Sequence, residues 1–171
     1  MAEKRGSRIN SNAVSLAGEF AVLSQLALRG FDANITLGRT KGVDILLSEP
    51  DTSRMFRLEV KTNYRRSGGT SRLFGKFVSA WITSEKHERM TDPNLFYCFV
   101  NISDDTKQFK FYIVPSAVVA DFVKVSHATW LKKGNVKDTA MRQFIIGTRS
   151  EEYAIPTPTI EQYEDNWEFK G

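Results

Sequence analysis

The chain has 171 residues, a formal net charge of +4 at pH 7 and a sequence pI near 9.2. This length suits one hydrophobic core, and the mild positive charge is only a weak argument for an anionic partner. One cysteine excludes an internal disulfide framework, and no apolar run reaches the length of a membrane span. We therefore expect a single domain over residues 1–171, cytoplasmic and not associated with a membrane.

The chain begins with a basic segment followed by a helix. Residues 1–10 carry three basic side chains and no apolar core, so we expect a flexible basic arm rather than a targeting signal. Residues 12–29 have the apolar spacing of an amphipathic helix, and Gly30 follows as a typical C-cap residue. The expected inward stripe is Leu16, Phe20, Leu23 and Ala27.

One carboxylate in this helix occupies an unusual position. Glu19 lies beside Phe20 and at helical spacing from Leu16 and Leu23, so it borders or enters the expected stripe. The neighbouring Gly18 would allow another backbone to approach the helix closely. A boundary glutamate that extends to water is the alternative explanation.

A strand expected at 55–62 carries charge on one face. Its apolar residues share one side, whereas Arg57, Glu59 and Lys61 share the other. Three charges on an otherwise apolar strand are costly unless they face water, a metal or a polar ligand. The solvated face of an edge strand is the alternative explanation for Glu59 and Lys61.

The strand expected at 42–47 contributes another carboxylate. Asp44 interrupts its apolar run and points away from the apolar face of that strand. The short connection around Pro50 predicts an antiparallel hairpin with 55–62. Such a hairpin would bring Asp44 near Glu59 and Lys61.

Three features thus occur in sequence order: an acid in the first helix, an acid at the start of a strand, and Glu-x-Lys in the next strand. This order resembles the PD-(D/E)xK nuclease superfamily, and most closely its Holliday junction resolvase-like and small restriction-endonuclease-like branches. The resemblance covers the first third of the chain and departs at Val43, where the name-giving proline would stand. It implies a restriction endonuclease-like fold, an α/β domain with a central mixed sheet flanked by helices. The residues that carry it are Glu19, Asp44, Glu59 and Lys61.

The resemblance also implies an activity: metal-dependent hydrolysis of phosphodiester bonds in DNA by an endonuclease that leaves a 5′-phosphate. Mg²⁺ is the expected cofactor, with Mn²⁺ able to replace it, because hard oxygen ligands suit such ions. Asp44 and Glu59 would bind the ion directly, together with the Val60 carbonyl. Glu19 would hold a water ligand of the ion or complete a second metal site. Lys61 would orient the attacking water, lower its pKa and stabilise the developing anion.

Positive charge is concentrated directly after the proposed catalytic strand. Residues 57–76 contain six basic residues and one acidic residue, a net charge of +5, whereas 149–171 has a net charge of −4. Residues 64–72 are rich in Gly, Ser and Arg, which favours a mobile loop that contacts phosphates, although a solvated surface loop has the same composition. The expected DNA-contacting residues are Arg39, Lys41, Arg65, Arg66, Arg72 and Lys76.

Two further alternatives concern assembly and activity. A homodimer is compatible with this interpretation, because one site cuts one strand of a duplex and the resolvase-like branch is dimeric. An intact motif does not guarantee a productive metal site. A catalytically silent nuclease-fold module that binds DNA or a protein partner is therefore the alternative function.

The remaining segments are expected to be scaffold. Apolar runs predict strands at 95–100 and 109–114, with Cys98 as a buried structural thiol. We also expect a helix from 115 to about 133, a short apolar stretch at 144–146 and a C-terminal packing helix at 159–169. His87 lies among charged residues and is expected to be exposed, with a DNA-facing position as the alternative. His127 and Trp130 are expected to pack or to form a surface pair.

Overall fold

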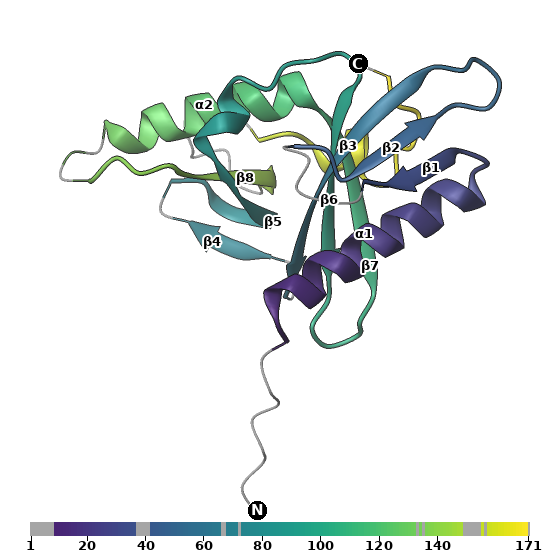
Figure 1. The fold of residues 1–171 in the computed structure, drawn as a ribbon. Helices are drawn as coiled ribbons and strands as arrows, with labels where there is room; N and C mark the ends of the chain where they lie inside the picture. Colours follow the sequence, from purple (N-terminus) through teal and green to yellow (C-terminus); the bar gives the residue numbers. More distant parts are fainter. Residues whose placement is uncertain are drawn as a thin grey trace, which may run out of the picture.

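The computed structural model describes residues 9–36, 42–65, 68–71, 73–132, 134, 136–148, 155 and 157–170. Over these residues the chain forms two β-sheets, three α-helices and one 3-10 helix (Figure 1). The elements in chain order are α1 (Ser11–Leu28), β1 (Asp32–Ile35), β2 (Ile45–Ser48), β3 (Met55–Tyr64), β4 (Gly69–Ser71), β5 (Gly75–Ser84), the 3-10 helix η1 (Glu85–Glu88), β6 (Leu95–Ile102), β7 (Phe109–Pro115), α2 (Ser116–Leu131), β8 (Met141–Thr148) and α3 (Ile160–Tyr163).

The larger sheet is mixed and has the strand order β1-β2-β3-β6-β7. Strands β3 and β6 run parallel, and the other neighbouring pairs run antiparallel. The expected α/β class with a central mixed sheet is therefore confirmed. A second, antiparallel sheet with the order β4-β5-β8 was not predicted.

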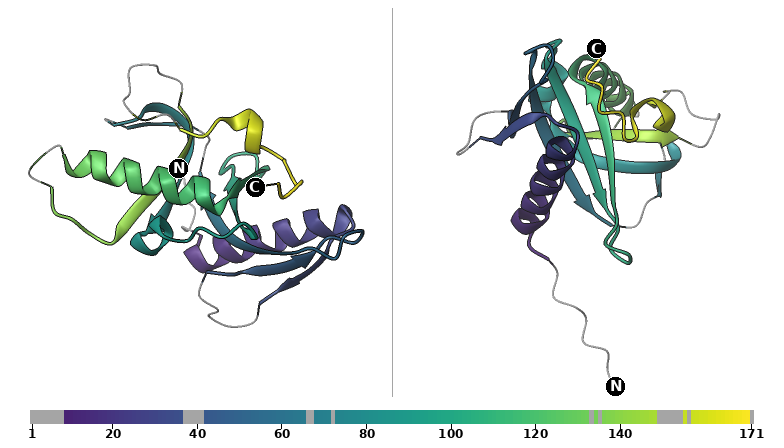
Figure 2. Two further views of the ribbon diagram at one scale, coloured as in Figure 1. Left: turned by 90° about the horizontal axis from the view of Figure 1, so that it is seen from above. Right: turned by 90° about the vertical axis from the view of Figure 1, so that its right-hand side faces the viewer.

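The central sheet is covered on both faces (Figure 2). Helix α1 packs on one face, and the second sheet and α2 lie on the other. Each face has its own hydrophobic cluster, and β6 contributes alternate residues to the two. All eight residues of β6 are buried, as expected for a strand that is enclosed on both sides.

Helix α1 has the expected extent but not the expected orientation. Its buried residues are Gly18, Val22 and Leu26, whereas Leu16 and Phe20 are 50% and 55% exposed. The predicted stripe of Leu16, Phe20, Leu23 and Ala27 was therefore wrong except at Leu23, which is half-buried and packs against the core. At Gly18 the helix lies so close to β3 that an added Cβ would be 1.8 Å from the Thr62 hydroxyl oxygen. Only glycine allows this approach, so the side of the helix that carries Gly18 faces β3.

The predicted hairpin is present. Strands β2 and β3 pair antiparallel, with Ile45 opposite Leu58 and Ser48 opposite Met55. Asp44 immediately precedes β2 rather than lying within it. Because β2 stops pairing at Leu58, the later part of β3 has no β2 neighbour along that edge.

The predicted scaffold is mostly present. Strands β6, β7 and β8 contain the expected segments, and helix α2 lies within its expected range. Cys98 is fully buried, which raises the pKa of its thiol. The C-terminal helix was predicted too long. It ends at Tyr163, and the irregular segment that follows buries Trp167 and Phe169. None of the described helices is long and apolar enough to cross a membrane.

Candidate active site

Strand β3 places an ion pair at the centre of the molecule. Glu59 is 2% exposed, and Glu59 Oε1 lies 2.5 Å from Lys61 Nζ. The Lys61 side chain is 27% exposed, so the lysine connects the buried carboxylate with the surface. The two side chains share one face of β3, as the alternation in the sequence predicted.

Asp44 is held against the same strand through its backbone and side chain. Its amide donates to the Leu58 carbonyl at 2.8 Å, and Asp44 Oδ2 accepts a 2.7 Å hydrogen bond from the Val60 amide. The N–H and C=O of one strand residue point to the same edge of that strand. The Val60 carbonyl therefore shares the Asp44 edge, where β3 lacks a β2 partner.

The electrostatics of the three acids differ. Burial raises the pKa of Asp44, and the Val60 amide and the Lys61 charge oppose that shift. Burial also raises the pKa of the half-buried Glu19, with a further increase from Asp44 and a decrease from Lys61. Glu19, on α1, is thus close enough to Asp44 and Lys61 for their charges to interact.

Glu59 shows the opposite behaviour. Burial opposes its ionisation, but hydrogen bonds and charges from His87 and Lys61 outweigh burial and lower the pKa of Glu59 to about 2. The carboxylate is therefore ionised although it is enclosed. Such a charge persists only where donors surround it.

One of these donors was not predicted. His87 is 2% exposed, so the expectation of an exposed or DNA-facing histidine was wrong. Helix η1 places His87 Nε2 2.9 Å from Glu59 Oε1, and Lys86 Nζ lies 3.5 Å from the same oxygen. The charged neighbours of His87 in the sequence obscured a buried contact.

The second oxygen of Glu59 is different. Glu59 Oε2 is buried and has no hydrogen-bond partner among the described residues. A Cβ added at Gly42 would lie 3.2 Å from this oxygen and 2.7 Å from Met90 Cε, so the absence of a side chain lets the Gly42 backbone lie close to the carboxylate. Buried carboxylate oxygens without a partner are rare in native proteins and call for an explanation such as an unseen ion or water.

The donor set fits a small hard cation only in part. Within the described residues, no group of three His, Cys, Asp or Glu side chains is arranged to hold a metal ion. Mg²⁺, however, keeps several waters and commonly takes only one or two carboxylates from a protein. Asp44 and Glu59 with the Val60 carbonyl satisfy this smaller requirement.

A cleft of about 390 Å³ continues from Lys61 along β3. It lies between β3, β5 and the start of α1, and Asn63 and Arg65 line it on the β3 side. Arg65 Nη2 donates to the Ala80 carbonyl at 2.6 Å, and burial lowers the pKa of its guanidinium group. Arg65 thus reaches the cleft but is also part of the contact between the two sheets.

The other predicted DNA contacts are distributed differently. Lys76 is exposed on β5. Part of the predicted loop at 64–72 is strand β4, which pairs with β5, so the expectation of a loop was wrong there. The expected contacts that lie outside the described residues are Arg39, Lys41, Arg66 and Arg72.

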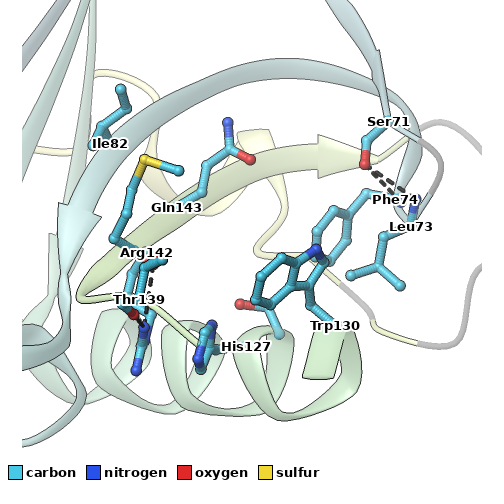
Figure 3. Close-up of a pocket in the computed structure, with 11 residues that line it drawn as sticks. Ser71, Leu73, Phe74, Ile82, His127, Trp130, Thr139, Arg142 and Gln143 are labelled. Carbon is cyan, nitrogen blue, oxygen red and sulfur yellow. Dashed lines mark hydrogen bonds between the residues drawn. The ribbon is translucent and has the colours of Figure 1, made fainter. Parts of the chain in front are cut away.

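A second hollow, also of about 390 Å³, lies between α2 and β8 (Figure 3). His127 stacks on Trp130 with ring centroids 5.4 Å apart, as the surface-pair expectation allowed, and its Nε2 lies 2.8 Å from Asp138. Arg142 donates to Glu88 and to the Thr139 carbonyl. The charged groups of this hollow therefore have partners within the protein.

Comparison with known proteins identifies a related fold. The structure of a bacterial homing endonuclease, I-Ssp6803I, matches 93% of this chain and 91% of its own chain, with a TM-score of 0.50 and 12% sequence identity. No protein-family model and no curated protein matches the sequence. At this identity the match establishes a nuclease-like fold alone. Membership of the PD-(D/E)xK superfamily stays a prediction.

Proposed function

We propose that the protein is a metal-dependent endonuclease that hydrolyses phosphodiester bonds in DNA and leaves a 5′-phosphate. The observation that carries this proposal is the meeting of Asp44, Glu59 and Lys61 at the open edge of β3. The fold shared with a homing endonuclease supports the same conclusion. The sequence order of these residues, with Glu19, is that of the PD-(D/E)xK pattern.

Asp44, Glu59 Oε2 and the Val60 carbonyl would hold Mg²⁺ or Mn²⁺. The bound ion would polarise the phosphate and increase the acidity of water at neutral pH. Glu19 lies in the same electrostatic environment as Asp44 and Lys61, and its carboxylate would accept a hydrogen bond from a water at the site. A cation would also relieve the repulsion that Asp44 exerts on Glu19.

Lys61 would act on the substrate. It would orient the attacking water through a hydrogen bond from its ammonium group and stabilise charge that develops on the phosphate. The Glu59 carboxylate lies 2.5 Å from the ammonium group and positions it at the site. Its partial exposure gives the ammonium group access to a ligand in the cleft.

The cleft supports DNA as the substrate. Arg65 directly follows β3, four residues after Lys61, which corresponds to roughly 13 Å if the usual rise of a strand continues to it. One strand of B-DNA rises about 3.4 Å per nucleotide along the helix axis, so a duplex whose axis is parallel to this path would advance about four nucleotides over this distance. Arg65 and the exposed Lys76 are the described residues that we assign to phosphate contacts, and Arg39, Lys41, Arg66 and Arg72 belong to the same proposal.

We include a homodimer in the proposal, because one site of this kind cuts one strand of a duplex. Light scattering of the purified protein measures its mass directly. A mass of two chains supports the dimer. If the measured mass contains one protein chain both for the free protein and for its complex with duplex DNA, the dimer is rejected.

One observation favours the alternative of a silent module that binds DNA or a protein partner. The described residues contain no group of three metal-binding side chains, and Glu59 Oε1 already has donors. A site of this kind can bind phosphate without cutting it. Cleavage assays separate the two functions.

The decisive assay offers linear, supercoiled, single-stranded and four-way-junction DNA in Mg²⁺ or Mn²⁺. We expect cleavage that Asp44→Ala and Lys61→Ala reduce by at least about 100-fold. Lys86→Ala is the matched control, because Lys86 also lies near Glu59 Oε1 but is 49% exposed, and we expect a change below about fivefold. If the protein binds all four substrates but cuts none of them in either metal, the nuclease is rejected and the silent module remains.

A further inference from the structure

His87 and Glu59 form a buried contact between two elements that are distant in sequence. Both residues are 2% exposed, and the 2.9 Å hydrogen bond joins η1 to the centre of β3. The His87 ring also packs edge-on against Tyr97, with centroids 5.7 Å apart. The imidazole is therefore confined by packing as well as by its hydrogen bonds.

Ser84 fixes the orientation of the His87 ring. The Ser84 amide donates to His87 Nδ1 at 2.9 Å, which completes a capping box at the start of η1. An amide can only donate, so this bond leaves the ring proton on Nε2, where it is donated to Glu59 Oε1. The Ser84 carbonyl also lies 2.9 Å from Nδ1 and would accept from the doubly protonated ring. In both forms Nε2 donates to Glu59.

The two oxygens of Glu59 have unequal surroundings. Oε1 has Lys61 at 2.5 Å, His87 at 2.9 Å and Lys86 at 3.5 Å. Oε2 is equally enclosed but lacks a partner among the described residues, and the Gly42 backbone lies close to it. A buried carboxylate that needed only neutralisation would share its donors between both oxygens.

We infer that His87 is a positioning residue that holds Glu59 Oε1 so that Oε2 is presented to a hard divalent cation. This inference rests on the metal site of the proposed function. A ring N–H donor suits the role, because its directed hydrogen bond orients the carboxylate oxygen that it contacts. His87 also keeps Oε1 hydrogen-bonded when Lys61 turns from Glu59 towards a phosphate.

The test is Mn²⁺ affinity, measured by calorimetric titration without DNA. We expect His87→Ala to weaken binding by about 10- to 100-fold, the usual effect of removing a group that orients a metal ligand. His87→Gln keeps an N–H near the position of Nε2, and we expect it to stay within about threefold of the wild type on the same grounds. A merely structural histidine would not give this rescue.

His127→Ala is the matched control, because His127 also donates to a carboxylate, at 2.8 Å, but in the hollow beside α2. It should leave Mn²⁺ affinity unchanged. Equal affinity of His87→Ala and the wild type overturns the inference, and so does a His87→Gln variant as weak as His87→Ala. Thermal unfolding of each variant verifies that it is folded.

A Mn²⁺-soaked crystal of the wild type tests the inference without any substitution. We expect the ion on Glu59 Oε2 and His87 Nε2 still on Oε1. An ion on Oε1 with His87 displaced overturns the inference. Absence of Mn²⁺ binding in the wild type rejects the metal site and His87 together, whereas the expected affinities without DNA cleavage reject only the nuclease function.

Discussion

Glu59 and Arg142 are both buried charges in strands, but their surroundings differ. The Arg142 side chain is 5% exposed and donates to Glu88 and to the carbonyls of Thr139 and Met141. Glu59 instead gathers its donors on one oxygen and leaves the other without a partner among the described residues. A buried charge whose bonds end within the protein indicates a structural role, whereas a buried acceptor left open indicates a ligand.

The largest expected effect concerns stability at Arg142. Arg142→Met keeps an apolar stem but removes the buried charge that pairs with the part-buried Glu88, and we expect a loss of about 3 kcal/mol in the free energy of unfolding. Urea unfolding measures it. Lys110→Ala breaks an exposed pair with Glu164 and should cost less than about 1 kcal/mol. The cleavage rate per folded molecule should stay unchanged in Arg142→Met. A lower rate would contradict the purely structural role that distinguishes Arg142 from Glu59.

The same comparison predicts how stability depends on pH. Glu59 has a pKa of about 2 in the fold against 4.5 when unperturbed, so its ionised form stabilises the fold above pH 4.5. This contribution, about 3 kcal/mol, is lost as the pH falls from 4.5 to about 2. The raised pKa values of Asp44 and Glu19 act in the opposite direction, since their contribution is lost as the pH rises through those values.

Glu59→Gln isolates the Glu59 contribution, because Asp44 and Glu19 remain in the variant. Urea unfolding in a chelator should show wild type more stable than Glu59→Gln at pH 6, and this difference should fall to about a quarter at pH 2.5. A difference that stays constant over this range contradicts the low pKa of Glu59.

The sequence predicted the elements that have a clear pattern. The hairpin followed from an apolar run with a short turn, and Asp44, Glu59 and Lys61 followed from charges placed against that pattern. Strand β5 was missed because nearly all its residues are buried, so its two faces do not alternate. The basic residues around it suggested a variable surface region instead.

Two other misses have local physical causes. Leu16 and Phe20 are large apolar side chains of α1, but the helix approaches β3 through Gly18, whose role depends on the position of Thr62. His87 was hidden by its charged neighbours. The spacing of Ser84 and His87, which matches a capping box, was the one local signal that the histidine points back into the fold.

A smaller effect is expected in the cleft. Arg65→Ala removes one phosphate contact in the proposed path of the DNA, so binding should weaken by less than about tenfold and the salt dependence should fall by about one unit. Fluorescence anisotropy at several salt concentrations measures both. Arg54→Ala is a control of the same type on the hairpin, where Arg54 stacks on Phe56, and it should leave the salt dependence unchanged. An unchanged slope for Arg65→Ala would place the DNA elsewhere.

Asp44→Asn tests the proposed site most directly. Burial raises the pKa of Asp44, so its charge is unfavourable in the metal-free fold, while asparagine keeps an oxygen for the Val60 amide. We predict unchanged or higher stability together with a loss of at least about 100-fold in single-turnover cleavage of end-labelled duplex DNA in Mg²⁺. If Asp44→Asn instead cleaves within about threefold of the wild-type rate under the same conditions, a catalytic site at Asp44, Glu59 and Lys61 is contradicted.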